Sequence, residues 1–108
     1  MKQSHEDVLR DVLIQHAQVE EYSRRSLEDD VVIDACSLRL PAAVNLLGRL
    51  PEDTLDALFG GQWHAMRGMR NRIAHGYLAI RADVVRATVR DDLPRMREAI
   101  EGYLARLA

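Results

Sequence analysis

Apolar residues recur at steps of three and four along almost the whole chain, and this spacing limits the possible folds more than any other feature. Such steps place apolar side chains on one face of an α-helix, whose period is about 3.6 residues. No stretch shows the alternation that a half-buried β-strand needs. The pattern predicts helices at 5–25, 29–49, 51–59, 62–75 and 83–107, forming an all-α, up-down bundle of four to five helices.

Two prolines lie inside these predicted helices. Pro41 should kink the helix at 29–49 rather than end it, because the apolar stripe keeps its phase beyond the proline. The stripe also keeps its phase through Pro94, so 83–107 should be one long helix with a bend. The chain has no repeat, low-complexity run or linker, and 108 residues suffice for one hydrophobic core. We therefore expect residues 1–108 to form a single domain.

Composition excludes several classes of protein. Apolar residues make up 47% of the chain, which is too many for a disordered protein. The single cysteine, Cys36, excludes an internal disulfide framework and a cysteine-based zinc site, and its apolar neighbours predict a buried thiol. His5 and His16 have no second ligand at metal spacing, so we expect both on the surface and predict no metal and no cofactor. No membrane span or signal peptide is visible, which predicts a cytoplasmic protein.

Residues 63–77 form the most informative segment. Met66, Met69 and Ile73 share one helix face, which should pack into the core together with Trp63. A second set recurs at helical spacing on the opposite face: His64, Gly68, Asn71 and His75. An ordinary solvated face would favour glutamate, lysine and glutamine, and the glycine costs about 1 kcal/mol relative to alanine. Close approach of a backbone or a ligand would be a reason to keep it.

Arg70, Asn71 and His75 stand near the end of this predicted helix. Histidine changes its charge near neutral pH, as proton transfer requires. Asn71 lies one helical turn before His75 and can touch or orient its imidazole. Arg70 lies about 140° round the helix from His75. Either the arginine reaches round the helix, or a second copy of the helix completes the site.

The motif Arg70-Asn71-x-x-x-His75-x-Tyr77 resembles the R-N-x-x-x-H-x-Y signature of HEPN-domain proteins. It is similar in particular to HepT, the toxin half of the HEPN–MNT toxin–antitoxin systems. The flanking residues, the length and the helical pattern agree, and the similarity is strongest over 63–107.

The second predicted helix departs from that family. Such proteins often carry a Gly-Glu pair there, whereas this chain has Val44-Asn45 at the same level. Pro41 in the same helix is also unusual for the family.

The resemblance implies a metal-independent endoribonuclease. A base would remove the proton of a 2′-hydroxyl, whose oxygen then attacks the adjacent phosphate. His75 would act as base or acid, Arg70 would bind the phosphate, and Asn71 would orient His75 or the ribose. The resemblance also implies a homodimer, which brings two such segments together and supplies two histidines for the two proton transfers.

A partner and a modification follow from the same resemblance. Tyr77 is similar to the tyrosine that a cognate MNT-type nucleotidyltransferase antitoxin adenylylates. An AMP group there would add bulk and negative charge beside the phosphate-binding arginine and block RNA. Tyr77 can instead be a half-buried core tyrosine, and both roles can hold.

The charges are unevenly distributed, although the net charge is only −2. Residues 1–59 hold six basic and twelve acidic side chains, whereas residues 60–90 hold six arginines against one aspartate. This split predicts a confined phosphate-binding strip around His75, with Arg67 and Arg72 as RNA contacts. The acidic segment is left for a partner or for solubility.

Two other functions stay open beside the nuclease. The chain can be a catalytically silent HEPN subunit that positions substrate for a nucleotidyltransferase, or a helical dimer with a structural role only. Arg70 and His75 favour the nuclease, because an adaptor needs neither residue. His64 is expected to serve packing or an interface rather than catalysis.

Overall fold

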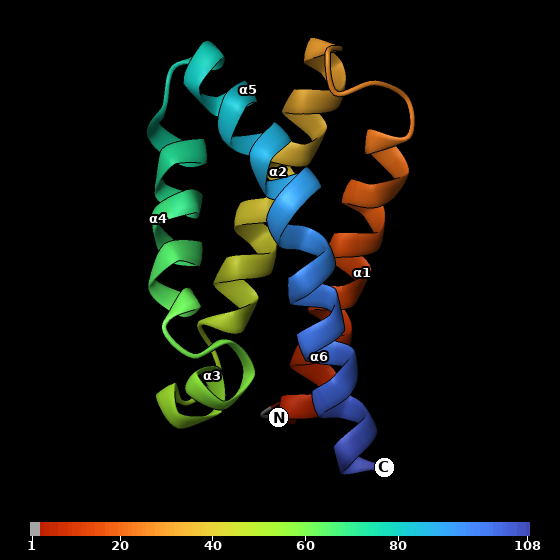
Figure 1. Ribbon diagram of the computed structural model, residues 1–108, viewed down its shortest axis with the longest axis vertical. Helices are drawn as coiled ribbons and strands as arrows, with labels where there is room; N and C mark the ends of the chain where they lie inside the picture. Colours follow the sequence, from red (N-terminus) through yellow and green to blue (C-terminus); the bar gives the residue numbers. More distant parts are fainter. Residues whose placement is uncertain (1–2) are drawn as a thin grey trace.

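Helices occupy most of residues 3–108, the part of the chain that the computed structural model describes, and no strand occurs among them. Their bounds are α1 His5–Ser23, α2 Asp30–Leu47, α3 Glu52–Phe59, α4 Gln62–His75, α5 Leu78–Ala87, the π-helical turn η1 Thr88–Asp92 and α6 Leu93–Leu107. α5, η1 and α6 follow one another without a break, so the described residues form five helical rods. The four long rods alternate in direction, and the short α3 connects α2 to α4 at one end of the bundle (Figure 1). The prediction of an all-α bundle of four to five helices is confirmed.

Side-chain caps fix where the first two helices begin. The Ser4 hydroxyl accepts the Asp7 backbone N–H at 3.0 Å, and the Asp29 carboxylate accepts the Val31 N–H at 2.8 Å. Serine and aspartate are preferred in this position because they satisfy backbone N–H groups that the first helical turn leaves without a partner. The observed ends of the first four helices lie within two residues of the predicted ones.

The last rod begins five residues earlier than predicted, at Leu78 instead of 83. Its first turn is closed by the Arg81 N–H, which donates to the Tyr77 carbonyl at 2.8 Å. Leu78 is 50% exposed, and burial in this rod begins only at Ala82. The apolar stripe therefore starts later than the helix, which is why the spacing placed the beginning too late.

Pro94 is accommodated by the π-helical turn that precedes it. The Leu93 N–H donates to the carbonyl of Thr88, five residues back instead of four. Proline lacks an N–H and its ring clashes with the carbonyl four residues earlier, so a local widening of the helix lets the rod continue. The prediction of one continuous helix through Pro94 is confirmed, and α2 likewise continues through Pro41.

The core lies between α1, α2, the inner side of α4 and the α5–α6 rod. Its largest fully buried aliphatic side chains are Leu9, Ile33, Leu40, Leu47, Ile73, Leu93 and Ile100. Cys36 is also fully buried, as predicted, and burial raises the pKa of its thiol. Within residues 3–108 no helix is both long and apolar enough to cross a membrane.

His16 is buried, so the prediction of a surface histidine is wrong. Its side chain is 1% exposed, and neither ring nitrogen has a hydrogen-bond partner among the described residues. Val12, His16 and Val19 share the inward face of α1, and that spacing outweighs the polarity of the imidazole. Burial, reinforced by the charge of Arg97, lowers the pKa of His16 to about 4. His5 is exposed, as predicted.

Candidate active site

The helix α4 presents two faces, as its sequence predicts. The inward face is buried and consists of Trp63, Met66, Met69 and Ile73. The opposite side forms what we call the outer ridge: His64, Gly68, Asn71 and His75. The three polar members are exposed, and the glycine is half-buried. A Cβ atom at the glycine would meet only the flexible end of the Arg72 side chain, so packing within the chain does not demand a glycine there.

The guanidinium of Arg70 is held by two amide oxygens. Its Nη1 donates to Asn45 Oδ1 and its Nη2 donates to Asn71 Oδ1, both at 2.9 Å. Because Asn45 lies on α2, the contact ties α4 to its neighbour. An amide oxygen carries no formal charge, so the guanidinium keeps its positive charge and its remaining N–H groups for a phosphate.

Asn45 is a site residue that the sequence patterns did not identify. They singled out Val44-Asn45 only as a departure from related proteins. In the structure Val44 is buried in the core, and Asn45, the next residue round α2, is exposed on the side that meets Arg70. The two contacting residues are 25 positions apart, and no local spacing specifies such a pair.

His75 stands apart from the other two predicted catalytic residues. Its side chain is exposed and makes no hydrogen bond with any described residue. Asn71, expected to orient this histidine, accepts a hydrogen bond from Arg70 instead. Arg70 thus reaches round the helix as far as Asn71 on the outer ridge but makes no hydrogen bond to His75. Within one chain the site has a fixed cation and a separate, free imidazole.

Gly76 and Arg81 fix the end of α4, where His75 lies. The Gly76 N–H donates to the Arg72 carbonyl at 2.9 Å, and a Cβ atom at position 76 would overlap that oxygen. Its φ of −81° is open to any residue, so this glycine is required by close approach rather than by a left-handed conformation. Arg81 Nε donates to the Ile73 carbonyl at 3.0 Å, which satisfies one of the last carbonyls of the helix.

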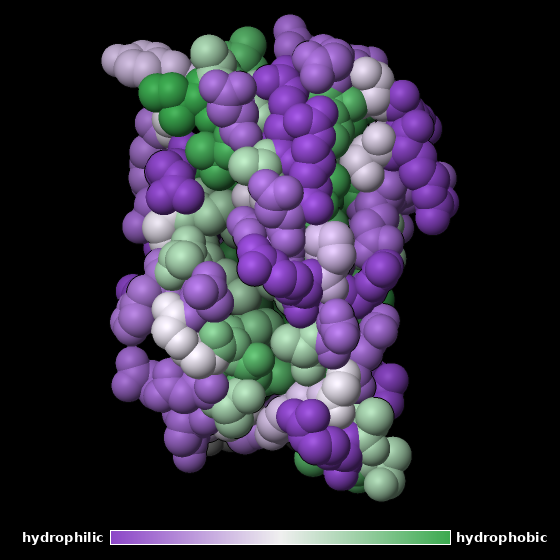
Figure 2. Space-filling view, viewed as in Figure 1, coloured by the Kyte–Doolittle hydropathy of each residue, from purple (hydrophilic) through white to green (hydrophobic). Residues whose placement is uncertain are grey.

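Tyr77 projects from the corner between α4 and α5. Its side chain is 85% exposed, so the alternative of a half-buried core tyrosine is wrong. Leu78 and Ile80 are 50% and 49% exposed beside it. Figure 2 shows hydrophobic side chains gathered on the surface at this corner. An apolar patch next to the only histidine at the end of α4 is the kind of surface that another protein covers.

A basic cavity lies on one side of α4. It measures about 430 Å³, opens between α2, α3 and α4, and includes four polar residues that we call the basic pocket: Asn45, Arg49, Arg67 and Arg70. Arg67 was predicted as an RNA contact, and the structure places it beside Arg70. Arg49 was not identified from the sequence, because it belongs to the acidic segment and meets the other arginines only through the fold.

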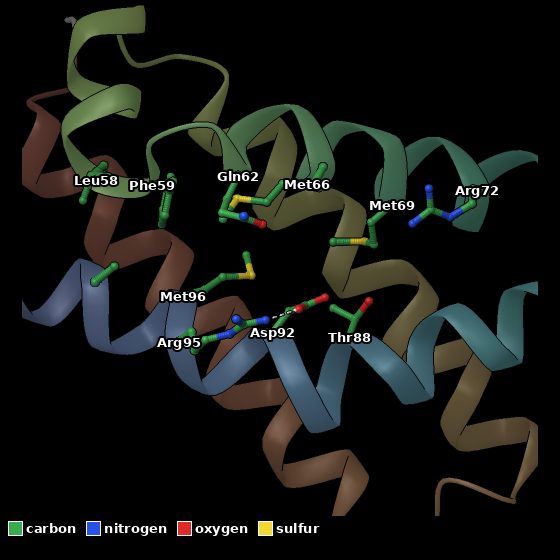
Figure 3. A pocket seen from close by; sticks show the side chains of 12 residues that line it. Leu58, Phe59, Gln62, Met66, Met69, Arg72, Thr88, Asp92, Arg95 and Met96 are labelled. Carbon is green, nitrogen blue, oxygen red and sulfur yellow. Dashed lines mark hydrogen bonds and ion pairs between the residues drawn. The ribbon is translucent and has the colours of Figure 1, made fainter.

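A different cavity, of about 340 Å³, lies on the other side of α4 and contains Arg72. Figure 3 shows it between α4 and the η1–α6 rod, with Met66, Met69 and Met96 pointing into it. We call it the methionine groove. Arg72 and Arg67 are therefore not in one strip. They lie about 70° to either side of the outer ridge, since each residue advances the helix by about 100°.

Comparison with known proteins identifies the family of this chain. Residues 8–102 match the family model described as "Ribonuclease HepT-like". The chain is also similar to the probable ribonuclease HepT of Thermococcus cleftensis, at 26% identity over 106 residues that cover 94% of this chain and 96% of that protein. No solved structure matches it. The family match covers most of the chain, including all of α4. The chain therefore belongs to the HepT-like ribonuclease family.

Proposed function

We propose that this HEPN-type ribonuclease cleaves RNA without a metal ion, by attack of a ribose 2′-hydroxyl on the adjacent phosphate. The observation that carries the proposal is the arrangement on α4. Arg70 is fixed by neutral groups with its charge intact, and the free imidazole of His75 follows on the same helix. Five residues separate them, or about 8 Å along the helix axis.

These two groups suit the steps of such a cleavage. A neutral imidazole takes the 2′-hydroxyl proton while the O2′–P bond forms, and an imidazolium gives a proton to the 5′-oxygen as the P–O5′ bond breaks. The products are a 2′,3′-cyclic phosphate and a 5′-hydroxyl. Arg70 binds the phosphate oxygens as negative charge develops on them. Arg67 and Arg72, on either side of the outer ridge, contact the neighbouring backbone of the same strand.

A homodimer supplies the second imidazole. Each chain has one histidine at the end of α4, whereas the reaction needs a base and an acid. The outer ridge offers a place for two copies of α4 to approach, because Gly68 presents no side chain and its neighbour can move. Leu78 and Ile80, in the first turn of α5, are further exposed apolar side chains that a second copy could cover. Sedimentation at micromolar concentration should give a particle of twice 12.3 kDa. A monomer there would contradict the two-histidine site.

The enzyme is further proposed to be the toxin of a toxin–antitoxin pair. A cognate MNT-type nucleotidyltransferase would neutralise it by attaching AMP to the exposed hydroxyl of Tyr77, two residues from His75. The added negative charge and bulk would then compete with RNA at the arginines. Co-expression with that partner should add AMP to the intact mass of the wild-type chain and not of Tyr77→Phe. Added AMP on the variant would place the modification elsewhere.

Product analysis tests the cleavage itself. The purified, unmodified protein should cut cellular RNA in an excess of EDTA and leave 2′,3′-cyclic phosphate ends. Loss of all cleavage in EDTA, with recovery on adding a divalent cation, would contradict the metal-independent reaction. Wild-type protein that cuts no RNA under either condition would instead favour the silent substrate-binding subunit.

A further inference from the structure

The three arginines of the basic pocket lack the carboxylate partners that several other arginines have. Five arginines elsewhere pair with carboxylates: Arg10, Arg24, Arg86, Arg95 and Arg97. In the basic pocket, Arg70 donates to two asparagine amides, and Arg49 donates to the amide oxygen of Gln3 at 2.7 Å. Arg67 makes no ion pair within residues 3–108. None of the three charges is therefore cancelled by a carboxylate partner.

The walls and floor of this cavity have different chemistry. Arg49, just after α2, and Arg67 and Arg70, on α4, supply three positive charges, with Glu52 as the single acidic side chain in the lining. The floor is apolar and buried, and consists of Val44, Leu50, Leu55 and Trp63. Desolvation by an apolar floor strengthens the attraction between a cation and an anion. The cavity is therefore suited to a phosphodiester, whose charge meets the arginines.

The methionine groove serves as a comparison within the same molecule. Its Arg95 donates to Asp92 at 2.9 Å, so one of its two cations is already paired (Figure 3). Among the described residues that line the methionine groove, only Arg72 is a cation without a carboxylate partner, whereas the basic pocket has three such cations.

We propose that the basic pocket binds a second phosphate of the RNA, next to the phosphate that is cleaved. This inference rests on the proposed function. Arg67 precedes His75 by eight residues, or about 12 Å along α4, and Arg70 lies between them. A strand that runs along α4 would place its reacting phosphate between Arg70 and His75 and a neighbouring phosphate against Arg49 and Arg67. Asn45 links the two phosphate positions, because it lines the basic pocket and also holds the guanidinium of Arg70.

Binding of an uncleavable RNA tests the proposal. The probe is a fluorescent single-stranded oligonucleotide with a 2′-O-methyl group on every ribose, titrated by anisotropy at several salt concentrations. Arg49→Ala and Arg67→Ala should each raise Kd by about tenfold. Each should also lower the slope of log Kd against log salt by about 0.7, the value for one phosphate of a single strand. With cleavable RNA, the same variants should raise KM and change kcat little.

The matched control is Arg25→Ala. Arg25 lies in the turn between α1 and α2, at the end of the bundle away from α3 and the basic pocket (Figure 1). It is exposed and makes no ion pair within residues 3–108, so the variant removes the same charge from the whole molecule. Its Kd and salt slope should match those of the wild type.

Three outcomes would overturn the assignment of the pocket. One is that Arg49→Ala and Arg67→Ala bind the probe as Arg25→Ala does. The second is that they bind it normally but no longer dimerise, which would make the pocket a protein contact. The third is that wild-type protein does not bind the probe. The proposed function fails separately, if the wild type binds the probe through these arginines but cuts no RNA.

Discussion

RNA cleavage should fall by about 10³-fold or more when His75 is replaced with alanine, because the dimer then loses both its base and its acid, each worth about 10²–10⁴-fold. Arg70→Ala should lower kcat by about 10²–10³-fold, since it removes the charged donor that faces the developing phosphorane charge. Arg70→Lys should recover little, because an ammonium has no planar fork for Asn45 and Asn71 to hold. Single-turnover rates with one RNA measure all three variants, and the exposed His5→Ala is the control that should cleave at the wild-type rate.

A dimer with one altered protomer sharpens this prediction. Two differently tagged chains, one wild-type and one His75→Ala, can be purified as a mixed dimer. If the two histidines share the proton transfers, this dimer should retain far less than half of the wild-type rate. A rate near one half would mean that each protomer holds a complete site, and the two-histidine account would be abandoned.

Acid should destabilise the fold through His16. The imidazole is buried and its pKa is lowered to about 4, while in the unfolded chain it returns to 6.5. Above pH 6.5 both states are neutral and stability does not depend on this group. Below that pH the unfolded state takes up the proton first, so stability falls until the folded state also titrates near pH 4. The loss should reach about 2 kcal/mol at pH 5 and about 3 kcal/mol at pH 4 and below.

Urea unfolding at pH 7, 6 and 5 measures this loss. The groups that face His16 include Arg97, whose own partner is Glu20 at 2.6 Å, and the positive charge of Arg97 adds to the cost of protonating the ring. His16→Leu should remove most of the pH dependence between 7 and 5, whatever its effect on stability at pH 7. His5→Ala should keep the full dependence. A wild-type protein equally stable at pH 7 and pH 5 would show that the buried ring finds a partner for its proton.

The spacing of apolar residues was sufficient to predict the helices and the buried face of α4, because burial repeats with the period of the helix. The prediction for His16 was wrong because the polarity of the imidazole was given more weight than its position on the apolar face of α1. The spacing also missed the first turn of α5, because this turn is exposed and its apolar residues are not part of the buried stripe that begins at Ala82. The separation of Arg67 from Arg72 follows from helix geometry alone, because residues five apart lie about 140° from each other round an α-helix.

The hydrogen bonds that fix Arg70 depend on the packing of α2 against α4. Val44 enters the core and turns Asn45 toward α4, and that contact exists only once both helices have packed. A glutamate in that place would pair with Arg70 and cancel its charge, whereas an asparagine holds the guanidinium and leaves the charge available to RNA. The Val44-Asn45 pair, where the sequence was expected to differ from the HEPN pattern, thus contains the residue that positions the arginine.

An RNA with one altered ribose tests the proposed reaction most directly. The cleavage site of a short RNA is mapped first, and the nucleotide on the 5′ side of the cut phosphate is then made as its 2′-deoxy form. The strand keeps its phosphates, so binding by Arg49, Arg67 and Arg70 should change little. Cleavage at that phosphate should disappear, while cleavage at unaltered sites of the same strand continues. A cut at the 2′-deoxy position would contradict 2′-hydroxyl attack and the roles given to Arg70 and His75.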